Sequence, residues 1–494
     1  MKRALRWYDH VSINIFWLGI NVASGSITPV ILPYLVALFV SPEIKNTSLA
    51  TIRVVGLAVA MLVQPMAGTY SDRSTHRWGR RRPFILVGTL LNLLFLLIVG
   101  ASPLFVDSPL DQVTRAALGV GAAYVVLMVG IVLLQVSSNI GHGALQGLIP
   151  DLVPEEQRGR SSGVKAVMEL LPVFLVLFIG PLVDSGRVGV AIGIVMGAFL
   201  ITMLITLLAV HEEPLAQKPE GSVREPLLRL VALTAIFVAV TRAAVWLVGW
   251  AGRYLGSIGA DATTQVAVVG AAGLAGMAGS IFVGVYFGAR VGIGKQARQQ
   301  RSFIWWVINR LLFLAAVGSI QGFAQYFLAD VLQLPNAATM TTILLAVVAV
   351  FLLPSALGGG YLADRMGGRK RLVAYAGWIA AAGTLLLLFA RGIPLVLVSG
   401  CVIGLGTGLF YAANWALGTD LAPKGEAGRY LGISNLAGAG AGIVGAGIGG
   451  PMADFFNAVR PGLGYLVIFA IYGGLFLLSV VALRGVREPS AATG

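Results

Sequence analysis

Charged residues, cysteine and catalytic motifs are all scarce in this sequence. Only 11% of the 494 residues are charged and 57% are hydrophobic, whereas a water-soluble domain needs a larger charged surface. The single cysteine, Cys401, excludes an internal disulfide and a metal site built from several thiolates. The sequence contains no P-loop and no catalytic constellation. It therefore predicts neither an enzyme nor an ATP-driven pump, and no cofactor or metal.

Long apolar runs make up most of the chain instead. Runs of about 20 residues can cross the hydrocarbon core as helices, and they recur from end to end with short polar loops between them. We therefore predict an all-α membrane protein with fourteen spans. The predicted spans are 11–40, 49–70, 83–101, 116–149, 163–184, 188–210, 228–254, 262–288, 303–329, 337–362, 372–390, 393–418, 430–456 and 463–484.

The positive charges indicate the orientation of these spans. Most of the 35 Lys and Arg residues fall in the termini and in the loops on one side. The positive-inside rule makes that side cytoplasmic, so we expect a multi-pass protein of the plasma (cytoplasmic) membrane with both termini in the cytoplasm. The net charge of +14 then reflects topology and attraction to anionic lipid, and we expect no nucleic-acid partner.

Three segments of the sequence recur at similar offsets, which indicates an internal duplication. Residues 148–154 (Leu-Ile-Pro-Asp-Leu-Val-Pro) match 417–423, a Gly-Pro-x-x-Asp motif at 180–184 returns at 450–454, and a Gly-x-x-x-Asp-Arg loop at 68–73 returns at 360–365. The chain accordingly divides into a six-helix bundle at 1–214, a cytoplasmic linker with two extra transmembrane helices at 215–299, and a second six-helix bundle at 300–494.

Two six-helix repeats, each with an Asp-Arg loop after its second helix, resemble the major facilitator superfamily. That resemblance implies a major facilitator fold, with two additional central helices here, and secondary transport by alternating access. The loop Ser71-Asp72-Arg73, followed by Arg-Trp-Gly-Arg-Arg-Arg-Pro-Phe-Ile at 77–85, is similar to the sucrose carriers and the glycoside-pentoside-hexuronide cation symporters. Gln146 departs from that pattern, because the plant sucrose carriers have an arginine there.

Polar residues inside the spans predict the substrate site. On the first and fourth helix of the first repeat they follow one face at spacings of 3 and 4, and on the first helix of the second repeat they lie roughly on one side, while the fourth carries a further polar group. They also fall near the middle of the bilayer, where transporters bind their substrates. The predicted substrate-binding residues are Asn21, Asn139, His142, Gln146, Arg310, Gln321, Tyr411, Asn414 and Trp415. Alternatively, each amide or histidine forms only an interhelical hydrogen bond, and Trp17 and Trp415 only pack.

Glu169 is the predicted proton-coupling residue, because an ionised group at this depth is costly without a partner. Its aligned residue in the second repeat is Ala439, so the acid is not duplicated. We expect Arg310 or Lys165 to tune its proton affinity. The alternative is a local pair with Lys165, one helical turn away.

Charged loop residues predict a cytoplasmic gate. We expect Asp72 to pair with Arg158 or Arg160, and Asp364 with Arg429, when the cytoplasmic side closes. The predicted gating residues are Asp72, Arg73, Arg80, Arg158, Arg160, Asp364, Arg365 and Arg429. The alternative is a role in topology and folding only. The glycine-rich helix at 430–456 is expected to approach Gly68 in the second helix.

The sequence thus favours proton-coupled symport of a sugar or glycoside by a monomer, because amide groups with tryptophan suit a polyol. The alternative is a fourteen-span antiporter that exports drugs or other amphiphiles against protons. The two extra helices are expected to pack on the bundle, and Arg242 is the feature in them that suggests a part in transport.

Overall fold

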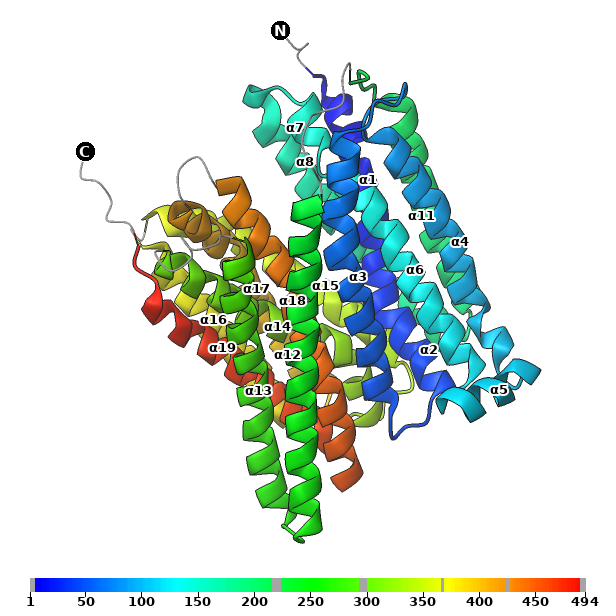
Figure 1. The fold of residues 1–494 in the computed structure, drawn as a ribbon, viewed down its shortest axis with the longest axis vertical. Helices are drawn as coiled ribbons and strands as arrows, with labels where there is room; N and C mark the ends of the chain where they lie inside the picture. Colours follow the sequence, from blue (N-terminus) through cyan, green and yellow to red (C-terminus); the bar gives the residue numbers. More distant parts are fainter. Residues whose placement is uncertain (1–4, 216–223, 293–299, 366–367, 423–426, 489–494) are drawn as a thin grey trace. The chain divides into compact units, whose positions relative to one another are not determined.

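The computed structural model describes residues 5–215, 224–292, 300–365, 368–422 and 427–488, without the side chains of residues 292, 363–364 and 427–437. All regular structure in these residues is helical (Figure 1). Thirteen helices among them are long and apolar enough to cross a membrane. A further long helix, α18 (Ala427–Val459), stands where the remaining predicted span was placed. The protein is therefore an all-α, multi-pass membrane protein.

The first repeat contains several interrupted helices. They are α1 (Trp7–Ser26), α2 (Leu32–Phe39), α3 (Lys45–Asp72), α4 (Arg82–Ala101), α5 (Pro109–Leu118), α6 (Ala122–Leu145), α7 (Leu148–Leu152), α8 (Arg158–Leu170), α9 (Pro172–Val176), α10 (Ile179–Asp184) and α11 (Val188–Ala209).

The rest of the chain forms longer helices. They are α12 (Arg224–Ser257), α13 (Ala262–Gly292), α14 (Arg301–Asp330), α15 (Ala337–Arg365), α16 (Arg369–Leu386), α17 (Ile393–Leu421), α18 and α19 (Leu463–Ala482).

Proline and glycine account for interruptions that hydropathy did not predict. A π-helical segment, Ile27–Ile31, joins α1 to α2 around Pro29, since proline has no N–H to donate to the preceding turn. Pro172 begins the short helix α9. The predicted span 116–149 is wrong at its start, because Gly119 ends α5 in the left-handed region at φ 73° and α6 begins only at Ala122.

The chain forms two compact units that do not coincide with the two sequence repeats. Unit 1 comprises Met1–Pro42, Val59–Leu228 and Asn336–Thr342, and unit 2 comprises Glu43–Ala58, Arg229–Pro335 and Ile343–Gly494. The start of α3 therefore belongs to unit 2 and the start of α15 to unit 1. Each repeat contributes the beginning of one helix to the unit built mainly from the other repeat.

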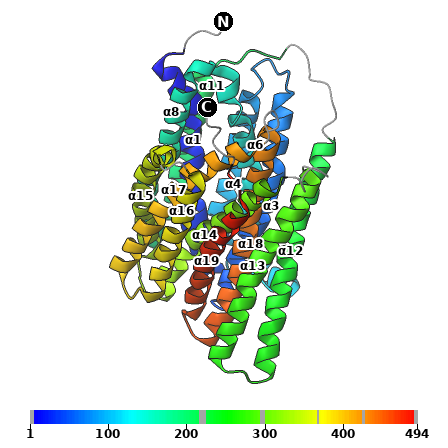
Figure 2. The same cartoon turned by 90° about the vertical axis from the view of Figure 1, so that its left-hand side faces the viewer.

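The extra helices α12 and α13 form a hairpin in unit 2, joined by a short turn (Figure 2). Small residues let them approach: Gly276 lies against Ala244, and Gly284 and Gly288 leave room for Phe237 and Leu233. Helix α13 also packs on α18 and α19. The hairpin is thus an integral part of unit 2.

Candidate functional site

A cluster of polar and aromatic side chains in unit 1 joins α1, α6 and α8. The Trp17 ring meets the His142 ring edge-on, with the ring centres 5.1 Å apart. On the same indole, the Lys165 ammonium lies 4.1 Å from the ring centre. Lys165 Nζ is also 3.1 Å from Glu169 Oε1. The predicted proton-coupling acid is therefore connected, through a lysine and a tryptophan, to the predicted substrate residue His142.

The amides predicted in unit 1 are anchored to their own helices. Asn21 donates to the Trp17 carbonyl at 2.8 Å, and Asn139 donates to the Gln135 carbonyl at 2.8 Å. Gln146 is exposed, with its amide nitrogen 3.4 Å from His142 Nε2. Gln146 and His142 are thereby placed side by side, as the four-residue spacing predicts.

A second cluster lies in unit 2, where α14 meets α17. Arg310 Nη1 donates to Asn414 Oδ1 at 3.1 Å, and the guanidinium lies 5.1 Å from the ring centre of Trp415. Asn414 in turn donates to Asn309 Oδ1 at 2.9 Å. The Trp306 indole donates to the Asn414 carbonyl at 2.9 Å. Three predicted residues, Arg310, Asn414 and Trp415, are therefore in direct contact.

The remaining predicted residues of unit 2 lie at different distances from this cluster. Tyr411 is 42% exposed, lies one turn before Asn414 and interacts electrostatically with Arg310. Gln321 is exposed and lies on α14 about 16 Å along the helix from Arg310. That separation places Gln321 outside the cluster around Arg310.

Asn309 is a member of this cluster that the sequence reasoning missed. It is fully buried and also donates to the Ser479 carbonyl at 2.9 Å, which joins α19 to α14 and α17. Its position next to Arg310 could have identified it from the sequence, because a polar residue beside a charge within a span is available to hydrogen-bond the groups around that charge. The one-face pattern excluded Asn309, because adjacent residues on a helix point in different directions.

A second missed residue, Arg81, is the centre of a charge cluster at the end of α3. Its guanidinium forms an ion pair with Asp72, and Nε donates to Asp151 Oδ2 at 2.8 Å. Nη1 donates to the Ser71 hydroxyl at 2.9 Å. Arg80 Nη2 lies 2.7 Å from Asp151 Oδ1. The Arg81 side chain is only 6% exposed, so this arginine, more than Arg80, holds the cluster together.

The structure gives Asp72 a different partner from the expected one. Asp72 pairs with Arg81, whereas Arg158 lies 3.4 Å from Glu155 and is not paired with Asp72. The side chains of Asp364 and Arg429 lie outside the described part of the chain. In the described part of the second repeat, Arg369 pairs with Asp420. This pair is equivalent to the pairs that Arg80 and Arg81 form with Asp151 in the first repeat. The Arg365 guanidinium lies 4.4 Å from the ring centre of Tyr361.

The segment that follows α11 also contacts this charge cluster, through Glu212. Glu212 Oε2 accepts hydrogen bonds from the backbone N–H groups of Arg81 and Arg82, at 2.8 and 3.1 Å, and so caps the first turn of α4. Burial raises the pKa of the Glu212 carboxyl above its usual value, although the two N–H groups act in the opposite direction. The chain leading to the extra helices is thus fixed to the charged loop.

The repeated Gly-Pro-x-x-Asp motif caps two helices. Asp184 Oδ1 and Oδ2 accept from the N–H groups of Ala338 and Thr339, at 3.1 and 2.8 Å, at the start of α15. Asp454 accepts in the same way from Asn46 and Thr47, at 3.2 and 2.7 Å, at the start of α3. In each case a carboxylate from one repeat caps a helix that begins in the other repeat.

The glycine of each motif makes that approach possible. A Cβ at Gly180 would stand 2.6 Å from the Thr339 Cα, and one at Gly450 would stand 2.6 Å from the Asn46 carbonyl oxygen. The helix at 430–456 therefore approaches the start of α3 within unit 2, whereas the expected contact with Gly68, which belongs to unit 1, stays a prediction. A Cβ at Gly68 would stand 3.5 Å from the Gly143 carbonyl oxygen of α6.

Comparisons with known proteins agree with this architecture. Among curated proteins, the chain is 35% identical over 113 residues to sucrose transport protein SUC3 of Arabidopsis thaliana, which is 22% of this chain and 19% of that protein. It is 30% identical over 175 residues to the general alpha-glucoside permease of Schizosaccharomyces pombe, 34% of this chain and 30% of that protein. The matches thus span less than a third of the length of these relatives.

Solved structures match over almost the whole chain. A D-xylose-proton symporter superposes with a TM-score of 0.62 at 15% identity, covering 98% of this chain and 99% of that one. A POT family transporter in complex with 5-aminolevulinic acid gives 0.64 at 13% identity, covering 96% and 94%. At these identities the likeness concerns the fold alone. A family model, the Major Facilitator Superfamily, matches residues 15–334 and 306–493, and the chain therefore belongs to this superfamily of transporters.

Proposed function

We propose that the protein is a secondary transporter that carries a sugar or glycoside together with protons by alternating access. The observation that carries this proposal is the cluster of Arg310, Asn414 and Trp415, in which a guanidinium, a buried amide and a partly exposed indole meet inside the membrane-spanning part of unit 2. Hydroxyl groups of a sugar accept from the guanidinium, which the buried Asn414 amide holds in place, and a pyranose packs on the indole.

The relatives support the same substrate class by their names, since one is a sucrose transport protein and another an alpha-glucoside permease. In this proposal the repeats at 1–214 and 300–494 form the transporter, which acts as a monomer in the plasma membrane with cytoplasmic termini. The residues of the predicted gate lie on the cytoplasmic side and separate when that side opens, and Arg81 joins them as their central member.

A ligand screen tests the substrate class. Disaccharides and glycosides should raise the melting temperature of the purified protein, because a ligand that binds the native state stabilises it. Asn414→Ala should weaken that binding about tenfold, because Arg310 loses the amide oxygen that positions its guanidinium for the substrate. Thr419→Ala, on the same helix with its hydroxyl bonded to its own helix, is the matched control. Stabilisation by cationic amphiphiles and not by sugars would favour the drug exporter.

The coupling role of Glu169 gives a second expectation. Glu169→Gln should still exchange labelled substrate across proteoliposome membranes but should no longer accumulate it against a gradient, because a neutral amide takes up no proton. Lys165→Gln distinguishes this role from a structural ion pair, since it breaks the same pair and leaves the carboxyl in place. If Glu169→Gln still accumulates substrate in response to a pH gradient, Glu169 does not carry the proton.

A further inference from the structure

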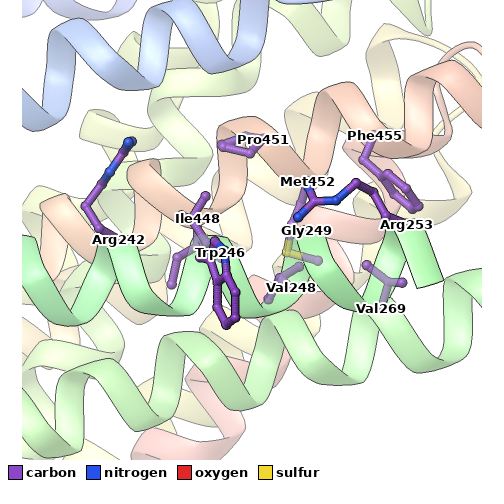
Figure 3. Close-up of a pocket in the computed structure, with 11 residues that line it drawn as sticks. Arg242, Trp246, Val248, Gly249, Arg253, Val269, Ile448, Pro451, Met452 and Phe455 are labelled. Carbon is purple, nitrogen blue, oxygen red and sulfur yellow. The ribbon is translucent and has the colours of Figure 1, made fainter. Parts of the chain in front are cut away.

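A cavity of about 320 Å³ lies in unit 2 among α12, α13 and α18, apart from both clusters described above. Figure 3 shows most of the side chains around it. The wall combines two arginines with aromatic and apolar side chains, and the residues that matter here are Arg242, Trp246, Gly249, Arg253, Pro451 and Phe455.

The two arginines have no acidic partner in the described part of the chain. Both are exposed, both lie in the apolar helix Arg224–Ser257, and the cavity wall contains no carboxylate. A guanidinium in a membrane span is costly unless it meets an anion, water or the interface. Since the protein supplies no anion to this wall, the charge of the cavity is complementary to an anionic ligand.

The two arginines lie on one face of α12. Residues 242, 246, 249 and 253 are separated by 4, 3 and 4 positions, so they form a single stripe about 16 Å long. Arg253 folds back along the helix (Figure 3), and its Nη1 lies 3.3 Å from where a Cβ of Gly249 would stand. The absence of a side chain at 249 leaves room for the charge to lie over the cavity.

The neighbouring aromatic rings indicate the depth of the cavity. Trp250 and Tyr254 stack with ring centres 5.6 Å apart and are 53% and 54% exposed, as expected for rings at the lipid headgroup level. Arg253 lies between them in the sequence, within one turn of the helix end. Phe455 packs against Gly252 beside Arg253. Trp246, about two turns earlier on α12, continues the wall toward the acyl chains and Arg242, so the cavity has a charged mouth, an apolar middle and a second charge farther in.

We propose that this cavity binds an anionic phospholipid, with its phosphodiester at Arg253 beside Phe455 and an acyl chain along Trp246. A guanidinium binds a phosphate with two parallel hydrogen bonds. Arg242, about 16 Å farther along α12, adds positive charge to the same wall, and the summed charge favours a lipid with net negative charge over a zwitterionic one. The cavity wall includes Pro451 of the Gly-Pro-x-x-Asp motif, so the lipid contacts the helix segment that positions Asp454.

Lipid titration of the purified full chain tests this site. Phosphatidylglycerol added to the protein in neutral detergent should raise its melting temperature, and phosphatidylcholine should do so much less. Arg242→Gln combined with Arg253→Gln should weaken phosphatidylglycerol binding at least tenfold, as counted by native mass spectrometry. Arg391→Gln removes an exposed arginine of the same unit that is not in the cavity wall, and it should bind phosphatidylglycerol like the parent.

Three results would overturn the proposal. The first is that the double variant binds phosphatidylglycerol as tightly as the Arg391→Gln control does. The second is that phosphatidylcholine stabilises the parent as much as phosphatidylglycerol does. The third is that inorganic phosphate alone gives the full stabilisation, which would indicate an anion site without a lipid. If the double variant is less stable without lipid, Arg242→Lys with Arg253→Lys replaces it, and retained preference for phosphatidylglycerol then supports the charge argument.

Discussion

Arg81→Met should destabilise the protein by about 1.5–3 kcal/mol, because it removes the buried member of an ion-pair cluster with its hydrogen bonds to charged partners and leaves Asp151 paired with Arg80 alone. Arg81 is 6% exposed, and it contacts Asp72, Asp151 and Ser71 together. The loss should be visible in the free energy of unfolding from detergent titrations. Arg81→Lys should recover only part of it, since an ammonium group cannot reproduce the fork of a guanidinium.

The second repeat contains a matched control for this prediction. Arg369 pairs with Asp420 at the equivalent place, but both side chains are more exposed, at 33% and 42%. Exposed ion pairs contribute little, so Arg369→Met should cost less than about 1 kcal/mol. Equal losses for Arg81→Met and Arg369→Met would show that burial does not set the importance of this cluster.

Asp184→Asn and Asp454→Asn should each release the start of one helix. Each carboxylate accepts two backbone N–H groups from that helix start, and replacing its charge by an amide should cost about 1–2 kcal/mol. That cost changes the equilibrium between the capped and the released helix start by a factor of about 5–30. Since the two caps share no residue, the double variant should combine both effects.

Cysteine labelling can measure this release. In a Cys401→Ser background, Ala338→Cys and Ala50→Cys place reporters at the starts of α15 and α3, where the native residues are 0% and 2% exposed. Asp184→Asn should raise the labelling rate at 338, and Asp454→Asn should raise it at 50. Ala376→Cys in α16, also buried in the parent, should stay unlabelled. Unchanged rates at 338 and 50 would mean that the two caps do not hold these helix starts.

The sequence predicted the helices better than their contacts. Span length and hydropathy depend on local composition, so the apolar helices were found, whereas the kink at Pro29 and the break at Gly119 depend on single residues within apolar runs. Arg81 lies in a run of three arginines, and only the packing of α3 and α4 decides which of them is buried.

In the candidate site, too, the sequence did not predict contacts between helices that are distant in the chain. Arg310, Asn414 and Trp415 were each chosen as a polar or aromatic residue of its own helix, and the structure places them in contact, while their part in substrate binding stays a prediction. Asn309 could not be chosen in this way, since its contacts come from α17 and α19. The role of Asp184 and Asp454 was visible only as a repeated motif, because a cap depends on a helix distant in the sequence.

The Asp454 cap has a consequence for how the protein is made. Asn46 and Asp454 are separated by 408 residues, which at about 5–20 residues per second corresponds to roughly 20–80 s of synthesis. During that interval the first turn of α3 has been inserted but still lacks the carboxylate that completes it. A chain that stops before α18 would keep this helix end uncapped, so quality control in the membrane could distinguish an incomplete copy from a finished one by this end alone.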